Sequence, residues 1–204
     1  MKLRGLYAIT PELADGEDLL RRVAQALDGG IAMLQYRNKG VVRLNEAKAI
    51  ARMCRDRAVP FIVNDDLALA LECGADGAHL GRDDGELVSA RAKLGGRLLG
   101  ASCYDSLAAA RAAVAAGADY VAFGSVFSSA TKPSAVRAPH SLFGEARTLG
   151  VPLVAIGGIT LENAPQLLKA GADALAVISD LFDMPDIAAR ARSYGKLFPH
   201  DIAQ

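Results

Sequence analysis

Short apolar runs alternate with longer amphipathic stretches along the whole chain, and this alternation limits the fold more than any other feature. Strands covered on both faces are apolar at nearly every position, whereas surface helices carry an apolar stripe at helical spacing. The runs predict eight strands, at residues 6–10, 33–37, 61–64, 77–80, 98–102, 120–124, 153–157 and 174–178. The intervening stretches predict helices, with apolar faces such as Leu19-Leu20-Val23-Ala24-Leu27 and Val88-Ala92-Leu94. The last helix is expected over residues 185–197, beginning at Pro185.

A repeated tripeptide supports eight strand–helix units. Gly30-Ile31-Ala32, Gly74-Ala75-Asp76, Gly117-Ala118-Asp119 and Gly171-Ala172-Asp173 precede the even-numbered strands, and their glycines are 44, 43 and 54 residues apart. Each glycine can adopt the left-handed conformation that ends a helix. We therefore predict one domain over residues 1–204, a single (β/α)8 TIM barrel of four quarters. The rival is an open, doubly wound α/β sheet. The longer third interval places a long, functional loop at residues 125–139.

Composition excludes several other classes of protein. Hydrophobic residues make up 51% of the 204 residues, enough to bury a core and to argue against disorder. The 23 basic and 23 acidic side chains leave no net charge, so nucleic acid is not expected as a partner. The chain lacks both an apolar window long enough for a membrane helix and a signal-peptide stretch, so we expect a cytoplasmic protein. Cys54 and Cys73 are expected in the core, on helices.

The chemistry of such barrels lies where the strands end, at their carboxyl termini. The second strand ends in Gln35-Tyr36-Arg37-Asn38-Lys39, which directs Gln35, Arg37 and Lys39 to the same side. Two cations and an amide converging in the barrel mouth indicate an anionic ligand. The alternative is a solvated loop that holds a structural ion pair.

Carboxylates follow the next two strands. The third ends in Asn64-Asp65-Asp66, and the fourth is followed by Asp83-Asp84. Oxygen ligands at neighbouring strand ends suit Mg²⁺, which keeps waters and often bridges to substrate phosphates. Aspartate pairs are also common in turns. His79 has two readings as well: it satisfies a neighbouring backbone group, or it orients a metal-binding carboxylate.

The remaining strand ends carry hydroxyls and glycines. Ser102 ends the fifth strand, and no base adjacent in sequence marks the following Cys103 as a nucleophile. The loop after the sixth strand contains Ser128-Ser129-Ala130-Thr131-Lys132, a plausible phosphate-gripping segment. Gly157-Gly158 and Ile178-Ser179 end the last two strands, where many barrels form a phosphate cup. Two anionic subsites across one mouth indicate a group transfer between two phosphorylated small molecules.

In their order along the chain, these residues resemble thiamine phosphate synthase, within a superfamily that also holds thiazole tautomerases. The resemblance covers nearly the whole chain, from Leu6-Tyr7-Ala8-Ile9-Thr10 to about Ile187. Its most specific elements are Gln35-x-Arg37-x-Lys39, Asn64-Asp65, His79-x-Gly81-x-x-Asp84, Gly124 through Thr131-Lys132, and Ile156-Gly157-Gly158-Ile159.

The resemblance implies an Mg²⁺-dependent transferase. It would couple hydroxymethylpyrimidine diphosphate to thiazole phosphate through a carbocation, releasing pyrophosphate. Gln35, Arg37, Lys39, Asn64, Ser102 and Lys132 would bind the pyrimidine diphosphate, and Asp65 and Asp84 the metal. Ser129, Thr131, Gly158, Ile178 and Ser179 would bind the thiazole phosphate. Lys132, Ser102 and Thr131 would act at the reacting centre.

The sequence also departs from the family pattern at several positions. These are Asp66, Arg82-Asp83, Cys103-Tyr104, Gly124-Ser125 and Ser128-Ser129. Two other readings therefore stay open: a barrel that isomerises thiazole phosphate, and a non-catalytic module that binds a phosphorylated ligand. The isomerase reading is disfavoured by the presence of the diphosphate and metal residues. The exposed helices expected on a barrel are compatible with a homodimer.

Overall fold

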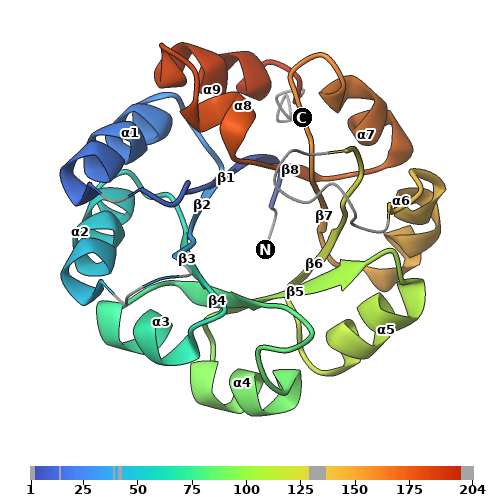
Figure 1. Ribbon diagram of the computed structural model, residues 1–204. Helices are drawn as coiled ribbons and strands as arrows, with labels where there is room; N and C mark the ends of the chain where they lie inside the picture. Colours follow the sequence, from blue (N-terminus) through green and yellow to red (C-terminus); the bar gives the residue numbers. More distant parts are fainter. Residues whose placement is uncertain (1–2, 14, 39, 41–42, 129–136, 199–204) are drawn as a thin grey trace, which may run out of the picture.

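The chain folds into a closed barrel of eight parallel strands that neighbour one another in sequence order, with β8 paired to β1. The computed structural model describes residues 3–13, 15–38, 40, 43–128 and 137–198. Helices form an outer ring around the strands, as Figure 1 shows in a view along the barrel. The predicted (β/α)8 barrel is confirmed, and the open doubly wound sheet is wrong because the sheet has no edge.

The strands begin and end within about two residues of the predicted bounds, because buried parallel strands are continuous apolar runs. They are β1 Gly5–Ile9, β2 Met33–Tyr36, β3 Phe61–Asn64, β4 Gly77–Leu80, β5 Leu98–Tyr104, β6 Tyr120–Phe123, β7 Leu153–Ile156 and β8 Ala174–Val177. The prediction ended β5 too early. A bulge at Cys103 carries this strand on to Tyr104, where pairing with β6 resumes.

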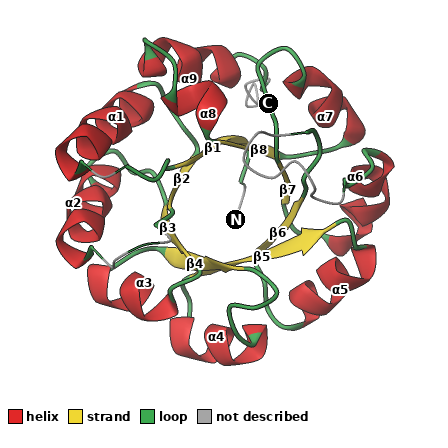
Figure 2. Cartoon of the chain, viewed as in Figure 1, coloured by secondary structure: helices red, strands yellow, loops and turns green. Residues whose placement is uncertain are grey.

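The helices lie outside the strands, red around yellow in Figure 2. They are α1 Gly16–Asp28, α2 Leu44–Arg55, α3 Leu67–Cys73, α4 Leu87–Leu94, α5 Leu107–Ala115, α6 Ser141–Ala146, the 3-10 turn η1 Arg147–Leu149, α7 Ala164–Ala170, α8 Ser179–Phe182 and α9 Ile187–Gly195. Within the described ranges, each helix is too short or too polar to cross a membrane.

Two helix predictions were wrong in detail. The last helix begins at Ile187 rather than Pro185, because the Asp186 side chain accepts a hydrogen bond from Ala189 N and caps the helix there. On α4 the buried side chains are Ala90 and Leu94, whereas Val88 is 64% exposed. Cys54 and Cys73 are buried on α2 and α3, as predicted.

The repeated tripeptides close the turns that precede the even strands. Gly30, Gly74, Gly117 and Gly171 all have positive φ, at 82°, 73°, 95° and 113°, as the sequence predicts. The aspartates have a further role that the sequence analysis missed. Asp76, Asp119 and Asp173 accept hydrogen bonds from the backbone N–H groups of Phe61, Leu99 and Leu153, at 2.8, 2.8 and 2.9 Å. Each carboxylate thus ties the start of one strand to the start of the next.

The core has two parts, inside and outside the strands. Ten buried residues cluster together in the smaller part, including Tyr7, Met33, Ile62, Tyr120 and Val154. The larger part lies between the strands and the ring of helices. Leu3, which precedes β1, also belongs to the smaller cluster.

Close packing at the N-terminal end of β4 yields the first prediction. A Cβ atom on Gly77 would lie 2.1 Å from the backbone oxygen of Leu98, so Gly77→Ala forces β4 and β5 apart. We expect urea unfolding to show a loss of about 3 kcal/mol in the free energy of unfolding. Gly96→Ala is the matched control, because a Cβ there meets nothing within 4 Å. Equal losses in the two variants would contradict the steric explanation.

Candidate active site

The end of β2 brings one predicted residue into the barrel and another to its rim. The Gln35 side chain is 3% exposed, and its Nε2 donates to the Tyr7 hydroxyl at 2.7 Å. Arg37 N donates to Thr10 Oγ1 at 2.9 Å, and its guanidinium pairs with Glu12 Oε1 at 2.8 Å. Arg37 thus forms an ion pair of the kind that the alternative named, and its role in binding an anion stays a prediction. Lys39 lies outside the described residues.

The ends of β3 and β4 lie side by side, because Asn64 and His79 are register partners. Asp65 N donates to the His79 carbonyl oxygen at 2.8 Å, and Asp65 has a φ of 62°, which aspartate tolerates better than most residues. Asp66 has a different role: its Oδ1 accepts from Leu69 N at 2.8 Å and caps α3. This departure from the family pattern is therefore a helix cap.

Asp84 closes a tight turn after β4. Its Oδ2 accepts from Gly81 N at 2.7 Å, and a Cβ on Gly81 would lie the same 2.7 Å from that oxygen. The Arg82 guanidinium lies 4.8 Å from the centre of the Tyr104 ring, so the end of β5 supports this turn. Arg82 and Tyr104, two departures from the family pattern, therefore contact each other.

The carboxylates at these two strand ends fit a sparsely liganded metal ion. Among the described residues, no three histidine, cysteine or acidic side chains are gathered to hold a metal. Asp65 and Asp84 follow neighbouring strands, and their oxygens are hard ligands. Mg²⁺ commonly takes one or two protein carboxylates and completes its shell with water and substrate phosphate. The donor set therefore fits Mg²⁺ bound together with a polyphosphate.

A chain of polar side chains crosses the barrel interior between Gln35 and Ser102. The Tyr7 and Tyr120 hydroxyls are 2.8 Å apart, and Tyr120 Oη lies 3.1 Å from His79 Nδ1. His79 Nε2 lies 2.9 Å from Ser102 Oγ. Both ring nitrogens thus contact hydroxyl groups. The sequence analysis predicted a backbone group or a metal-binding carboxylate as the partner of His79, and both predictions are wrong. Sequence reasoning missed both tyrosines, whose only signal was a polar atom within an apolar strand.

Burial controls ionisation along this chain of side chains. Desolvation lowers the pKa of His79 to about 4, against the smaller opposing effect of Asp84. Desolvation also raises the pKa values of Tyr7 and Tyr120 above the usual tyrosine range. At neutral pH the imidazole and both phenols are therefore uncharged. Burial likewise raises the pKa of the Cys103 thiol to about 12, which leaves it a poor nucleophile.

The loop after β6 packs along the end of β7. Val126 N donates to Ile156 O and Phe127 N to Gly157 O, both at 3.0 Å. Ser125 Oγ donates to Phe127 O at 2.6 Å, after a cis peptide bond between Gly124 and Ser125. A hydrogen bond from the Arg137 guanidinium to Ser128 Oγ joins the two described ends of the loop. Ser129, Thr131 and Lys132 lie outside the described residues.

The ends of β7 and β8 carry the residues that the sequence predicts to form a phosphate cup. Gly157 and Gly158 have φ values of 104° and 63°, and a Cβ on Gly158 would lie 2.4 Å from Ser128 O. These glycines therefore allow the loop after β6 to approach closely. Asn163 Nδ2 donates to Gly158 O at 2.9 Å and holds the turn. Ser179 begins α8 directly after Ile178.

A carboxylate on α8 anchors the segments that carry this predicted cup. Asp180, with a side chain 13% exposed, accepts from Arg190 Nη2 at 2.9 Å, from the Tyr194 hydroxyl at 2.5 Å and from Leu161 N at 3.1 Å. The three donors come from α9 and from the loop after β7. One side chain thus fixes α8, and with it the position of Ser179, against both neighbouring segments. Nothing in the sequence marked Asp180.

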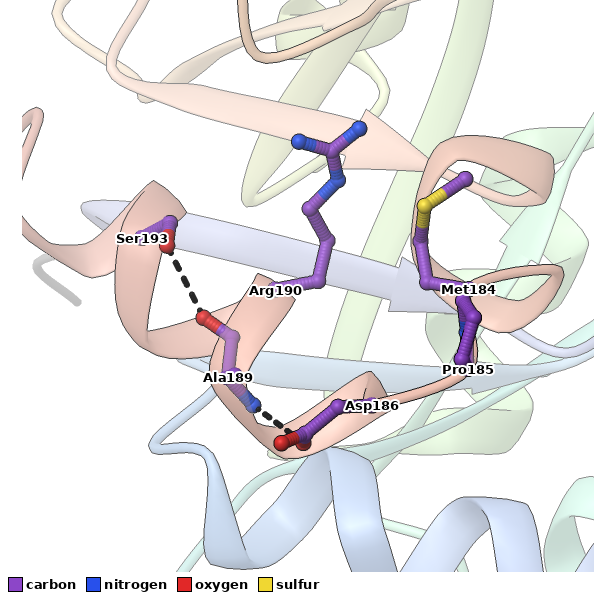
Figure 3. A pocket seen from close by; sticks show the side chains of 6 residues that line it. All are labelled: Met184, Pro185, Asp186, Ala189, Arg190 and Ser193. Carbon is purple, nitrogen blue, oxygen red and sulfur yellow. Dashed lines mark hydrogen bonds between the residues drawn. The ribbon is translucent and has the colours of Figure 1, made fainter.

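The hollow drawn in Figure 3 is separate from these strand ends. It has a volume of about 390 Å³ and is lined by Met184, Pro185, Asp186, Ala189, Arg190 and Ser193. Its polar groups already have structural partners. Asp186 caps α9, Ser193 Oγ donates to Ala189 O, and Arg190 binds Asp180. The hollow is therefore explained by the junction between α8 and α9.

The Asp180 anchor yields a stability prediction. Asp180→Asn replaces an acceptor of three hydrogen bonds with an amide that presents its NH₂ to one of the donors. We expect the free energy of unfolding to fall by about 2 kcal/mol, measured by urea denaturation. Asp183→Asn, the same change at an exposed residue one position beyond α8, is the control and should change stability little. An unchanged stability in Asp180→Asn would refute the anchor.

Comparison with known proteins agrees with this arrangement. A profile of the thiamine monophosphate synthase family matches residues 6–181. The thiamine-phosphate synthase of Aromatoleum aromaticum is 58% identical over 202 residues, 97% of each chain. That of Azoarcus sp. is 54% identical, with 97% of this chain and 98% of the relative covered. A thiamine phosphate pyrophosphorylase from Pyrococcus furiosus, known as a solved structure, superposes with a TM-score of 0.84 at 30% identity over 96% of both chains. This chain therefore belongs to the thiamine monophosphate synthase family.

Proposed function

We propose that this enzyme joins 4-amino-5-hydroxymethyl-2-methylpyrimidine diphosphate to thiazole phosphate, giving thiamine phosphate and pyrophosphate. The observation that carries the proposal is the distribution of polar groups around one barrel mouth. Gln35 and Asn64 lie at the ends of β2 and β3, and Ser102 lies late in β5. On the other side, Gly158 follows β7, and Ile178 and Ser179 follow β8. Two subsites on opposite arcs of the mouth suit two phosphorylated substrates.

The pyrimidine diphosphate would bind on the arc from β2 to β5, through Gln35, Arg37, Lys39, Asn64, Ser102 and Lys132. The Glu12 partner of Arg37 is 46% exposed, and an ion pair at the surface is worth about 0–1 kcal/mol. A diphosphate therefore competes easily for this guanidinium. The thiazole phosphate would bind through Ser129, Thr131, Gly158, Ile178 and Ser179, largely by backbone N–H groups.

The reaction would proceed by dissociation of the diphosphate. The bond between the pyrimidine methylene carbon and the diphosphate oxygen breaks, and its electron pair leaves with pyrophosphate. The thiazole nitrogen then gives its lone pair to the methylene carbocation, forming the C–N bond and leaving the positive charge on the thiazolium. Arg37, Lys39 and Lys132 would stabilise the charge that develops on pyrophosphate, with Thr131 and Ser102 beside the reacting atoms. The chemistry requires no protein nucleophile.

Asp65 and Asp84 would hold Mg²⁺ together with the diphosphate. When bound, the ion would neutralise charge on the leaving group. Support for this assignment comes from the two carboxylates at neighbouring strand ends and from the turn that Asp84 closes with Gly81 N. The cytoplasmic location and the homodimer expected from the sequence remain predictions.

An assay of product formation from both precursors tests the function directly. The purified chain, given both phosphorylated precursors, should form thiamine phosphate and pyrophosphate in equal amounts, and EDTA should stop both. Thiazole phosphate that binds, in calorimetry, without being coupled would favour a non-catalytic module. Its rearrangement to an isomer without the pyrimidine precursor would favour an isomerase.

Substitution of the acidic residues tests the metal assignment. Asp84→Asn keeps an oxygen for Gly81 N but removes the charge, so the Mg²⁺ concentration for half-maximal activity should rise at least about 10-fold. Asp65→Asn should act in the same direction. Asp66→Asn is the control, because asparagine caps a helix as well as aspartate does and Asp66 already caps α3. An unchanged Mg²⁺ titration in both test variants would remove the metal site.

A further inference from the structure

The buried polar side chains inside the barrel form one continuous path between two residues of the proposed substrate site. The path runs from Gln35 on β2 through Tyr7 on β1, Tyr120 on β6 and His79 on β4 to Ser102 on β5, with successive polar atoms 2.7, 2.8, 3.1 and 2.9 Å apart. Tyr7, Tyr120 and His79 are 1%, 0% and 6% exposed, so water does not supply alternative partners. Each polar hydrogen of these buried side chains must therefore be donated to a neighbouring side chain of the path.

The direction of hydrogen donation follows from the first link. The amide nitrogen of Gln35 donates and cannot accept, so the Tyr7 oxygen accepts there and gives its single hydrogen to Tyr120. The Tyr120 hydrogen then goes to His79 Nδ1, the other contact of that hydroxyl. In the reverse direction, a buried hydroxyl hydrogen would lack an acceptor, at a cost of about 1–3 kcal/mol.

The same logic continues through the imidazole ring. A neutral ring that accepts at Nδ1 carries its hydrogen on Nε2, and Nε2 then donates to Ser102 Oγ. The hydroxyl hydrogen of Ser102 is thereby left for another acceptor. Gly100 makes room for this arrangement, since a Cβ there would lie 2.2 Å from Tyr120 Cζ and 2.5 Å from His79 Nδ1.

We propose that Tyr7, Tyr120 and His79 are positioning residues that fix the Nε2–H tautomer of His79 and so make Ser102 a hydrogen-bond donor to the bound pyrimidine diphosphate. The inference rests on the proposed function for the identity of that substrate. The assignment of the His79 tautomer concerns the protein alone and is tested without any assay of activity.

Two conservative variants separate this role from simple packing. Tyr120→Phe removes the donor to His79 Nδ1, so the ring loses the hydrogen bond that favours the Nε2–H tautomer, and Ser102 can compete as a donor to Nε2. Tyr7→Phe makes the same chemical change one link earlier, yet Tyr120 keeps a hydrogen to give to Nδ1. The first variant should weaken the preference of His79 for the Nε2–H tautomer, and the second should preserve it.

Nitrogen NMR of the ring measures the tautomer. The chain has three histidines, so ¹⁵N-histidine labelling gives few ring signals, and His79→Gln identifies those of His79. We expect protonated Nε2 and unprotonated Nδ1 in the wild type and in Tyr7→Phe, with a shift toward Nδ1–H in Tyr120→Phe. Predominant Nδ1–H in the wild type would overturn the proposal, because the path would then run the other way.

A double-mutant cycle tests whether Tyr120 acts through Ser102. Tyr120→Phe should lower kcat/KM for the pyrimidine diphosphate on the order of 10-fold, the worth of about one hydrogen bond. In a Ser102→Ala background, the same substitution should have almost no further effect. An equal loss in both backgrounds would overturn the positioning role, since general damage to packing does not depend on Ser102. An enzyme inactive on this substrate would instead refute the proposed function, while the NMR result would stand.

Discussion

Hydrogen bonds from strand backbone N–H groups to three aspartate carboxylates hold the N-terminal ends of the barrel in register, and the rest of the molecule depends on that register. Asp76, Asp119 and Asp173 each accept from the first or second residue of the preceding strand. In a parallel sheet, this pairing decides which residues reach the carboxyl end together. In the first quarter of the repeat, Ala32 replaces the aspartate and packs against Gly5, where a Cβ would lie 2.8 Å away. The contacts that fix the register thus lie at the N-terminal ends of the strands, and the candidate site residues lie at the C-terminal ends.

A polar path through a barrel core is tolerable only when each group has a partner. Among the described residues, every buried side-chain nitrogen and oxygen has one. A partly satisfied network of buried polar groups costs more free energy than an apolar core. A substitution at any single residue of the Tyr7–Tyr120–His79 path is therefore expected to destabilise the fold. The path also explains how residues on β2 and β5, which are not neighbours in the sheet, are held in fixed relation inside the mouth.

Much of the fold was predictable from sequence, because apolar runs between left-handed glycines mark the strands of a parallel barrel. The exposure of Val88 was not, since helical spacing alone does not say which of two faces meets the sheet. At the site, position at or just after a strand end predicted Gln35, Asn64, Asp65, Asp84 and Ser102 as candidates. It did not reveal Tyr7 or Tyr120, because contacts across a barrel depend on the register of strands far apart in sequence. The Glu12 partner of Arg37 was hidden for the same reason.

Several departures from the family pattern become intelligible once their neighbours are known. Asp66 caps α3, and Arg82 stacks on Tyr104 beside the turn that presents Asp84. Ser125 holds the backbone of Phe127, and Ser128 accepts from Arg137 where the two described ends of the loop meet.

Each of these five residues thus supplies a local hydrogen bond or stacking contact at the edge of the mouth. Contacts of this kind support the loops that surround a site without removing any group assigned to its chemistry. These residues are therefore better explained as a change in the contacts that support the loops around the mouth than as a change in the reaction.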